Sequence, residues 1–284
     1  MAVTIGNERL QGASERGFAR VLDFAASSHA RAAIVLIVAA LLNILPGFFA
    51  IPPIDRDEAR FAQATKQMVE SGDYIDIHFQ DDVRYKKPVG IYWLQAGVVM
   101  AGDALGFQRA HTTIWLYRIP SLLGAIGAVL VTYWAALAFV TRRAAFLAGL
   151  MMATCLLLSV EGKLAKTDAM LLLTSVAAMG ALARAYLPEQ RARLAATSNW
   201  VVPAIFWTAL AGGVLLKGPV ILMFVGLAVG ALVVADRSAR WLLALRPLAG
   251  VGWFALLVLP WFLAIVMRAG DSFFVESIGQ DLLG

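Results

Sequence analysis

Residues 248–267 read LAGVGWFALLVLPWFLAIVM, a stretch without a single charged side chain. A helix rises about 1.5 Å per residue, so roughly 20 apolar residues are enough to cross the ~30 Å hydrocarbon core of a bilayer. Backbone polar groups find no water partners in lipid, and a helix satisfies them within the segment. The stretch therefore predicts a transmembrane helix and, with it, an integral membrane protein.

The composition extends this prediction to the whole chain. Of its 284 residues, 60% are hydrophobic and only 15% are charged, and the mean hydropathy is +0.74. A soluble domain carries much more charge. We predict an all-α, polytopic helical bundle with about seven spans. The expected spans are residues 32–50, 114–140, 144–160, 169–187, 200–216, 220–235 and 248–267.

Charge in the connections indicates the orientation. Residues 1–31 carry Glu8, Glu15 and Asp23 ahead of a long apolar run, so the first span is expected to be an anchor and not a cleaved signal. Short connections on the N-terminal side are rich in arginine, whereas cations of the long loop 51–113 are interspersed with acids. We expect a cytoplasmic N-terminus and an extracytoplasmic loop. The net charge of +5 then reflects topology and membrane lipids, and no nucleic-acid partner is expected.

The loop 51–113 has structure of its own. Residues 57–70 predict an amphipathic helix that ends at Ser71-Gly72-Asp73. Its apolar stripe consists of Phe61, Ala62, Thr65, Met68 and Val69. We expect this helix to lie on the membrane with its apolar face in the interface. Residues 89–96, which include two aromatic residues, predict a second, shorter interfacial segment.

Four short motifs occur along the chain: DEARFA at 57–62, YKKP at 85–88, KTDA at 166–169 and LKGPV at 216–220. In order and spacing they resemble the motifs of GT-C-fold glycosyltransferases that use polyprenyl-phosphate sugars. The most similar branch is that of the aminoarabinose lipid A transferases and protein mannosyltransferases. The resemblance covers residues 32–267, so we expect a GT-C-like transmembrane domain there. Residues 268–284 are expected to begin an extracytoplasmic segment that the sequence cuts short.

The resemblance implies a multi-pass enzyme of the bacterial inner membrane with a periplasmic active site. The expected donor is a sugar on undecaprenyl or dolichyl phosphate, and the acceptor is lipid A, a polysaccharide or a protein. Within the loop motif, Asp57 is the expected catalytic residue, which takes a proton from the acceptor or orients it. The same motifs imply a set of substrate-binding residues, namely Glu58, Arg60, Tyr85, Lys87, Asp168 and Lys217.

The residue chemistry agrees with these roles. The phosphate that leaves the sugar gains negative charge beside the bilayer, and Arg60, Lys87 and Lys217 are the cations expected to neutralise it. Attack from the face opposite the phosphate inverts the anomeric centre. Asp168 is expected to bind the acceptor or to hold the site together.

Structural interpretations compete with each of these roles. Asp57 is also a natural helix cap after Pro52-Pro53, and so is Asp168 with Thr167. Lys217-Gly218-Pro219 is also typical of a tight turn with a lysine that extends to the interface. The four motifs together favour function for Asp57 and Lys217.

A metal site has little support in the sequence. His78 lies near Asp76 and Asp81, but their spacing matches no known ligand pattern. In the aminoarabinose transferases, glutamate often precedes the loop lysine, whereas this chain has Lys86 before Lys87. A cation there replaces a possible metal ligand, so we expect no cofactor and regard a divalent metal as doubtful.

Two other functional classes stay open. A transporter has many helices too, but its ionisable residues lie at mid-depth in the spans, and here they gather at one boundary. A non-catalytic lipid-binding subunit is expected to lose the catalytic loop residues, and this chain keeps Asp57 and Lys87. Glycosyl transfer is therefore the preferred prediction.

Overall fold

The computed structural model describes residues 20, 22–197 and 199–270. This part of the chain is almost entirely helical, with one two-stranded antiparallel hairpin in which His78 is paired with Val83. The all-α prediction is thereby confirmed. The helices are α2 (His29–Ile44), α3 (Arg56–Ser71), α4 (Gly90–Ala104), α5 (Ile114–Ala136), α6 (Arg142–Ala153), α7 (Leu156–Glu161), α8 (Asp168–Tyr186), α9 (Pro188–Ala196), α10 (Val201–Lys217), α11 (Val220–Asp236) and α12 (Pro247–Ala269). Shorter elements are β1 (His78–Phe79), β2 (Asp82–Val83), η1 (Ala110–Thr112) and η2 (Arg240–Leu245).

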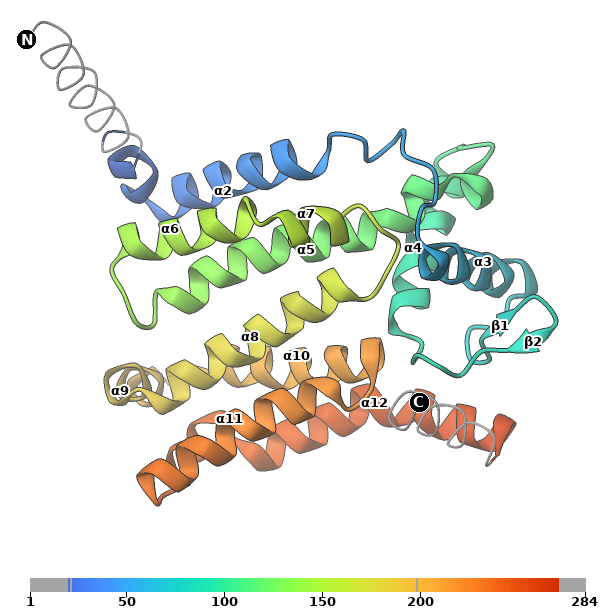
Figure 1. The fold of residues 1–284 in the computed structure, drawn as a ribbon. Helices are drawn as coiled ribbons and strands as arrows, with labels where there is room; N and C mark the ends of the chain where they lie inside the picture. Colours follow the sequence, from blue (N-terminus) through green and yellow to red (C-terminus); the bar gives the residue numbers. More distant parts are fainter. Residues whose placement is uncertain (1–19, 21, 198, 271–284) are drawn as a thin grey trace, which may run out of the picture.

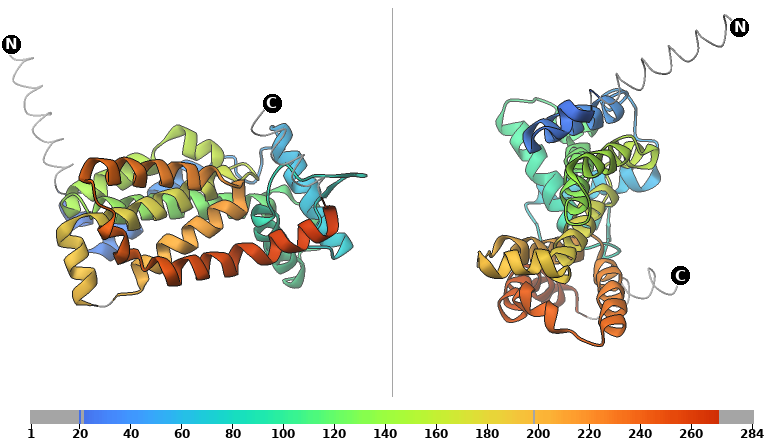
Figure 2. Two further views of the ribbon diagram at one scale, coloured as in Figure 1. Left: turned by 90° about the horizontal axis from the view of Figure 1, so that it is seen from below. Right: turned by 90° about the vertical axis from the view of Figure 1, so that its left-hand side faces the viewer.

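The long helices form an elongated bundle. Helix α5 contacts α2, α4, α6 and α8, while α10 contacts α8, α11 and α12. Figure 1 shows α3, α4 and the hairpin gathered at one end of this bundle and α9 at the other, and the views of Figure 2 agree. We call the end that carries α3 the outer end and the end that carries α9 the inner end.

The spans follow the sequence prediction in part. Helices α5, α8 and α12 are long and apolar enough to cross a membrane, and the bent pair α9 and α10 adds up to one more. Helices α2 and α11 are shorter apolar helices. The count of about seven spans stays a prediction. The expected continuous helix over 144–160 is wrong, because Thr154 and Cys155 separate α6 from α7 and the Thr154 hydroxyl donates to the Leu150 carbonyl over 3.0 Å.

The apolar face of helix α3 packs against protein, whereas the sequence prediction placed that face in the membrane interface. Its side chains Phe61, Ala64 and Met68 are buried in a cluster with residues of α4 and with Leu216 and Trp261 from the ends of α10 and α12. Protein therefore covers the apolar stripe that the sequence assigned to lipid. The amphipathic pattern is real, since apolar residues on one helix face need burial, but it does not say what covers that face.

The segment expected over residues 89–96 is longer than predicted and forms α4. Its first residue, Gly90, meets α10 directly: a Cβ atom there would lie 2.7 Å from the Leu215 carbonyl oxygen. Only glycine permits this approach. The start of α4 is thereby fixed at the end of α10, and both ends belong to the outer end of the bundle.

Candidate functional site

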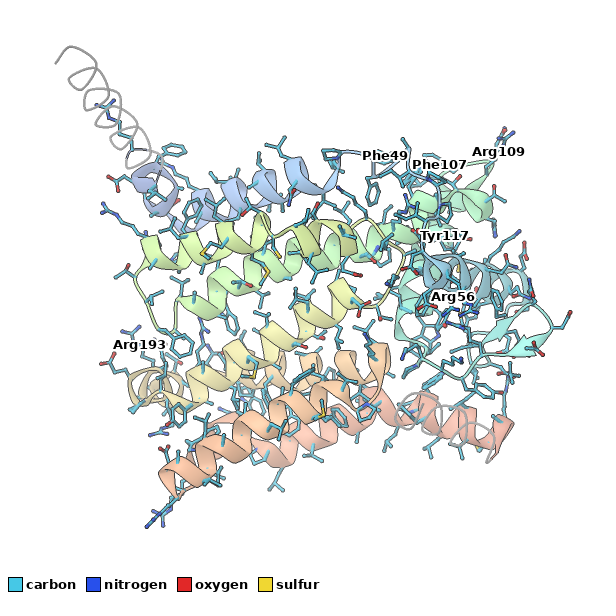
Figure 3. All side chains as sticks on the ribbon, viewed as in Figure 1. Phe49, Arg56, Phe107, Arg109, Tyr117 and Arg193 are labelled. Atoms are coloured by element: carbon cyan, nitrogen blue, oxygen red, sulfur yellow. The ribbon has the colours of Figure 1, made fainter. Side chains whose placement is uncertain are left out.

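The outer end brings together segments that are far apart in the sequence. These are the start of α3, the loop between α7 and α8, the start of α8 and the end of α10. Figure 3 labels Arg56 at the start of α3 and Tyr117 near it, with Arg193 at the inner end. The four sequence motifs lie in these segments or, for YKKP, directly before α4. The resemblance therefore predicted which parts of the chain meet.

A buried ion pair fixes the start of α3. The Arg118 guanidinium donates to Glu58 over 2.7 Å from Nε and 3.2 Å from Nη2. The Ala165 amide also donates to Glu58 Oε1 over 3.1 Å, and Arg118 Nη1 donates to the Phe48 and Ile51 carbonyls over 3.0 and 2.8 Å. Glu58 is 0% and Arg118 1% exposed. The expected substrate contact of Glu58 is thus corrected: protein encloses its carboxylate, which positions α3 against α5 and the α7–α8 loop.

The helix cap lies at Asp55 and not at Asp57. Asp55 Oδ1 accepts from the Asp57 amide over 2.6 Å and from the Glu58 amide over 3.4 Å. Its other oxygen accepts from Lys166 Nζ over 3.3 Å. The Asp57 amide hydrogen bond and Lys166 hold the pKa of Asp55 below its ordinary value, against the opposing effect of burial. The Asp57 side chain therefore does not cap α3.

Charged side chains next to Asp55 form a group that we call the outer charge cluster: Asp55, Glu161, Lys166, Asp168 and Lys217. Lys217 Nζ lies 2.5 Å from Asp168 Oδ1, so the structure joins two residues that the motifs nominated separately. Asp168 begins α8, and Thr167 before it makes no side-chain cap hydrogen bond. Both lysines are partly exposed, at 18% for the Lys166 side chain and 29% for that of Lys217.

The cluster contains one carboxyl group that differs from the others. Burial raises the pKa of Glu161, and its neighbours Asp168 and Asp55 act in the same direction, while Lys166 opposes them. One of its oxygens, Oε2, is buried and has no hydrogen-bond partner among the described residues. Burial lowers the pKa of Lys166, but the nearby Glu161 and Asp55 more than offset this and keep it raised. The raised pKa of Glu161 thus contrasts with the lowered pKa of Asp55 in the same cluster.

The predicted catalytic residue is open to solvent. The Asp57 side chain is 48% exposed and lies 3.5 Å from Arg60 Nη1, within the first turn of α3. Asp57 is also near enough to influence Tyr92, whose pKa is about 12, mainly because the phenol is buried. Tyr85 is buried and Lys87 half-buried on the segment that leads into α4. Asp57 thus presents a carboxylate to the solvent beside the capping residue of the outer charge cluster.

Sequence reasoning missed Arg118, Asp55, Glu161 and the role of Lys166. Each is an ionisable residue in or beside an apolar run, which is a signal for structural or functional importance in a membrane protein. The pairing partners were not predictable, because Glu58 is 60 residues from Arg118 and 107 from Ala165.

The described residues contain no group of three or more His, Cys, Asp or Glu side chains arranged to hold a metal. His78 Nε2, on the hairpin, lies 3.9 Å from Oδ2 of Asp76, which precedes the hairpin, and no third ligand joins this pair among the described residues. In the outer charge cluster, Lys166 pairs with Asp55 and Lys217 with Asp168.

Comparison with known proteins places this geometry in a family. Residues 34–272 match the family model described as dolichyl-phosphate-mannose-protein mannosyltransferase. The undecaprenyl phosphate-alpha-4-amino-4-deoxy-L-arabinose arabinosyl transferase of Erwinia tasmaniensis is 30% identical over 78% of this chain and 38% of its own length. The enzyme of the same name from Aeromonas salmonicida is 30% identical over 82% of this chain and 43% of its own.

Solved structures show the same fold. ArnT from Cupriavidus metallidurans in the apo state has a TM-score of 0.74 at 23% identity, covering 88% of this chain and 45% of ArnT. The same protein bound to undecaprenyl phosphate has a TM-score of 0.72 at 21% identity, covering 87% of this chain and 44% of ArnT.

This chain spans less than half the length of these relatives. The fold and the relatives together confirm a multi-pass membrane protein of GT-C architecture. The chain belongs to the dolichyl-phosphate-mannose-protein mannosyltransferase family.

Proposed function

We propose that this protein is a membrane glycosyltransferase that moves a sugar from undecaprenyl phosphate to an acceptor at the periplasmic face of the inner membrane. The observation that carries this proposal is the outer charge cluster next to the half-exposed Asp57, at one end of an apolar bundle. A lipid carrier brings its phosphate to such a boundary while its chain stays in the bilayer. The relatives' names supply the donor, since they act with undecaprenyl-phosphate-linked aminoarabinose.

In the proposed reaction, the bond between the sugar C1 and the phosphate oxygen breaks, and its electron pair stays on that oxygen. Lys166 and Lys217 stabilise the developing negative charge. They reach the phosphate by exchanging part of their contact with Asp55 and Asp168, which is possible because both lysines are partly exposed. Lys87 joins them from the segment before α4.

The acceptor forms its new bond from the opposite side of C1. The acceptor oxygen loses a proton to Asp57. The carboxylate of Asp57 is exposed and does not cap α3, because Asp55 does so. Arg60 lies 3.5 Å from Asp57 and orients that carboxylate. Lipid A is the acceptor that the resemblance to the aminoarabinose lipid A transferases implies, and a polysaccharide or a protein would offer a hydroxyl group to the same site.

The test measures release of free undecaprenyl phosphate from a panel of radiolabelled undecaprenyl-phosphate sugars, using protein made from the longest open reading frame that contains this chain. We expect Asp57→Asn to lower the rate of release by about 10²- to 10⁴-fold, as for loss of a general base. The matched control is Glu70→Gln, which removes an exposed carboxylate from the last turn of the same helix. Its rate should equal that of the wild type.

Two results would overturn the proposal. Equal release by wild type and Asp57→Asn would remove Asp57 from the reaction. No release by a folded wild type with any donor in the panel would remove glycosyl transfer itself.

A further inference from the structure

The inner end of the bundle carries a basic hollow that the proposed reaction does not use. It has a volume of about 350 Å³ and is lined by Arg191 from α9, Arg240 from η2 and Arg246, the residue that ends η2. The other lining residues that the structure describes are apolar or amide side chains. The carboxylate of Asp236 lies outside the hollow, in an adjoining cavity that Arg191 and Arg240 also line. Helix η2 contacts α8, α9, α10 and α12, which fixes the arginines relative to the bundle.

An apolar cavity of about 250 Å³ adjoins this hollow and shares Arg246 with it. Its walls include Trp200, directly before α10, Trp207 within α10 and Trp253 from α12. Trp207 Nε1 donates to the Leu245 carbonyl and Trp253 Nε1 to Thr208 Oγ1, each over 2.9 Å. The N–H groups of these two indoles are thus satisfied by protein, and the rings give the cavity an apolar wall.

The junction between the two cavities has a defined local structure. The Arg246 guanidinium lies over the Trp200 ring at 3.7 Å. The Arg246 backbone has φ +51°, a left-handed conformation that non-glycine residues rarely adopt. Gly250 lets the Trp207 ring lie against α12, because a Cβ there would be 1.8 Å from the indole nitrogen. Arg246 thus has an uncommon backbone conformation at the position where its guanidinium contacts an aromatic ring.

We propose that this double cavity is a binding site for one anionic phospholipid. Its phosphate is held by the three arginines and one acyl chain lies along the tryptophans. Arginine binds phosphate through charge-assisted, often bidentate, hydrogen bonds, and tryptophan favours the boundary between headgroups and acyl chains. Basic pockets between membrane helices take anionic headgroups in this way. Such a lipid would join α9 and η2 to α10 and α12 at the end opposite the reaction site.

A soluble phosphate has the same headgroup chemistry, so the test separates the two. Purified protein in a neutral detergent is titrated with phosphatidylglycerol, with phosphatidylcholine and with inorganic phosphate, and native mass spectrometry measures the bound fraction. We expect one retained phosphatidylglycerol that phosphatidylcholine does not replace and that inorganic phosphate does not displace. Each arginine contact contributes about 1 kcal/mol, so Arg240→Gln should weaken phosphatidylglycerol binding roughly fivefold.

Matched variants make the result specific. Arg193→Gln removes an exposed arginine from the same helix α9 (labelled in Figure 3) that does not line the hollow, and it should leave affinity unchanged. Trp253→Leu should weaken phosphatidylglycerol binding but leave the melting temperature in lipid-free detergent close to that of the wild type. Equal losses in Arg193→Gln and Arg240→Gln would overturn the proposal in favour of general charge attraction. Displacement by inorganic phosphate, or equal binding of phosphatidylcholine, would overturn it too.

Discussion

Asp57 and Glu58 are neighbours in the first turn of α3, yet their surroundings are opposite. Glu58 faces inward, where Arg118 and the Ala165 amide occupy its oxygens and no surface is exposed. Asp57 faces outward, is half-exposed, and has Arg60 as its ion-pair partner. One residue of the motif thus anchors the helix, and the next presents a carboxylate to the site.

The difference between Glu58 and Asp57 shows how the bundle positions an exposed carboxylate. A buried ion pair is costly to break because the remaining charge is left without solvent. An exposed pair contributes little to folding, so its members are free to serve chemistry. The position of Asp57 therefore depends on the fixed residue beside it, and the following predictions test that dependence.

The largest expected effect is on the buried pair. Arg118→Met leaves Glu58 charged and enclosed, so we expect the free energy of unfolding to fall by about 3–5 kcal/mol. The reactivity of the single cysteine, Cys155, with a thiol dye during heating can report unfolding, because this residue is partly buried between α6 and α7. The double variant Arg118→Met with Glu58→Leu removes both charges and should recover much of the loss. A single variant as stable as the wild type would contradict the anchoring role.

The capping residue should show a smaller effect. Asp55→Ala removes an N-cap and the contact with Lys166, so the free energy of unfolding should fall by about 1–2 kcal/mol. Asp55→Asn keeps a side-chain oxygen for the cap and loses only the charge, so its loss should be smaller. Thermal unfolding of the two variants separates these contributions. If alanine and asparagine are equally destabilising, the ion pair with Lys166 accounts for the stabilisation and the cap does not.

For Asp57 the prediction is a small effect on stability together with a large effect on activity. Asp57→Asn breaks an exposed pair with Arg60, which should change the free energy of unfolding by less than about 1 kcal/mol. The same protein sample should lose sugar release, so stability and activity are measured together. If Asp57→Asn destabilised the protein as much as Arg118→Met, Asp57 would have a structural role like that of Glu58.

The sequence told more about the exposed Asp57 and its motif than about the buried contacts of Glu58. The motif around Asp57 and the choice of Lys217 and Asp168 as site residues follow from local patterns and from the resemblance, whereas the pairing of these two residues comes from the structure. The apolar runs also predicted the long helices, since span length follows from bilayer thickness. What covers the Phe61 face of α3, and what neutralises Glu58, depend on chain segments far away in the sequence. Periodicity shows that a face is buried but does not identify its partner.

Glu161 gives the smallest expected effect, visible as a dependence on pH. Unfolded, its carboxyl titrates near the ordinary value of 4.5, and in the folded protein burial raises that pKa. Between these two values the folded state binds more protons, so Glu161 lowers stability progressively as pH rises through this window. Glu161→Gln lacks this proton, and its melting temperature should exceed that of the wild type increasingly from about pH 4.5 upward. The exposed Glu70→Gln serves as control and should follow the wild type at every pH. A constant difference between Glu161→Gln and wild type would show that Glu161 is ionised in the folded protein as readily as in the unfolded chain.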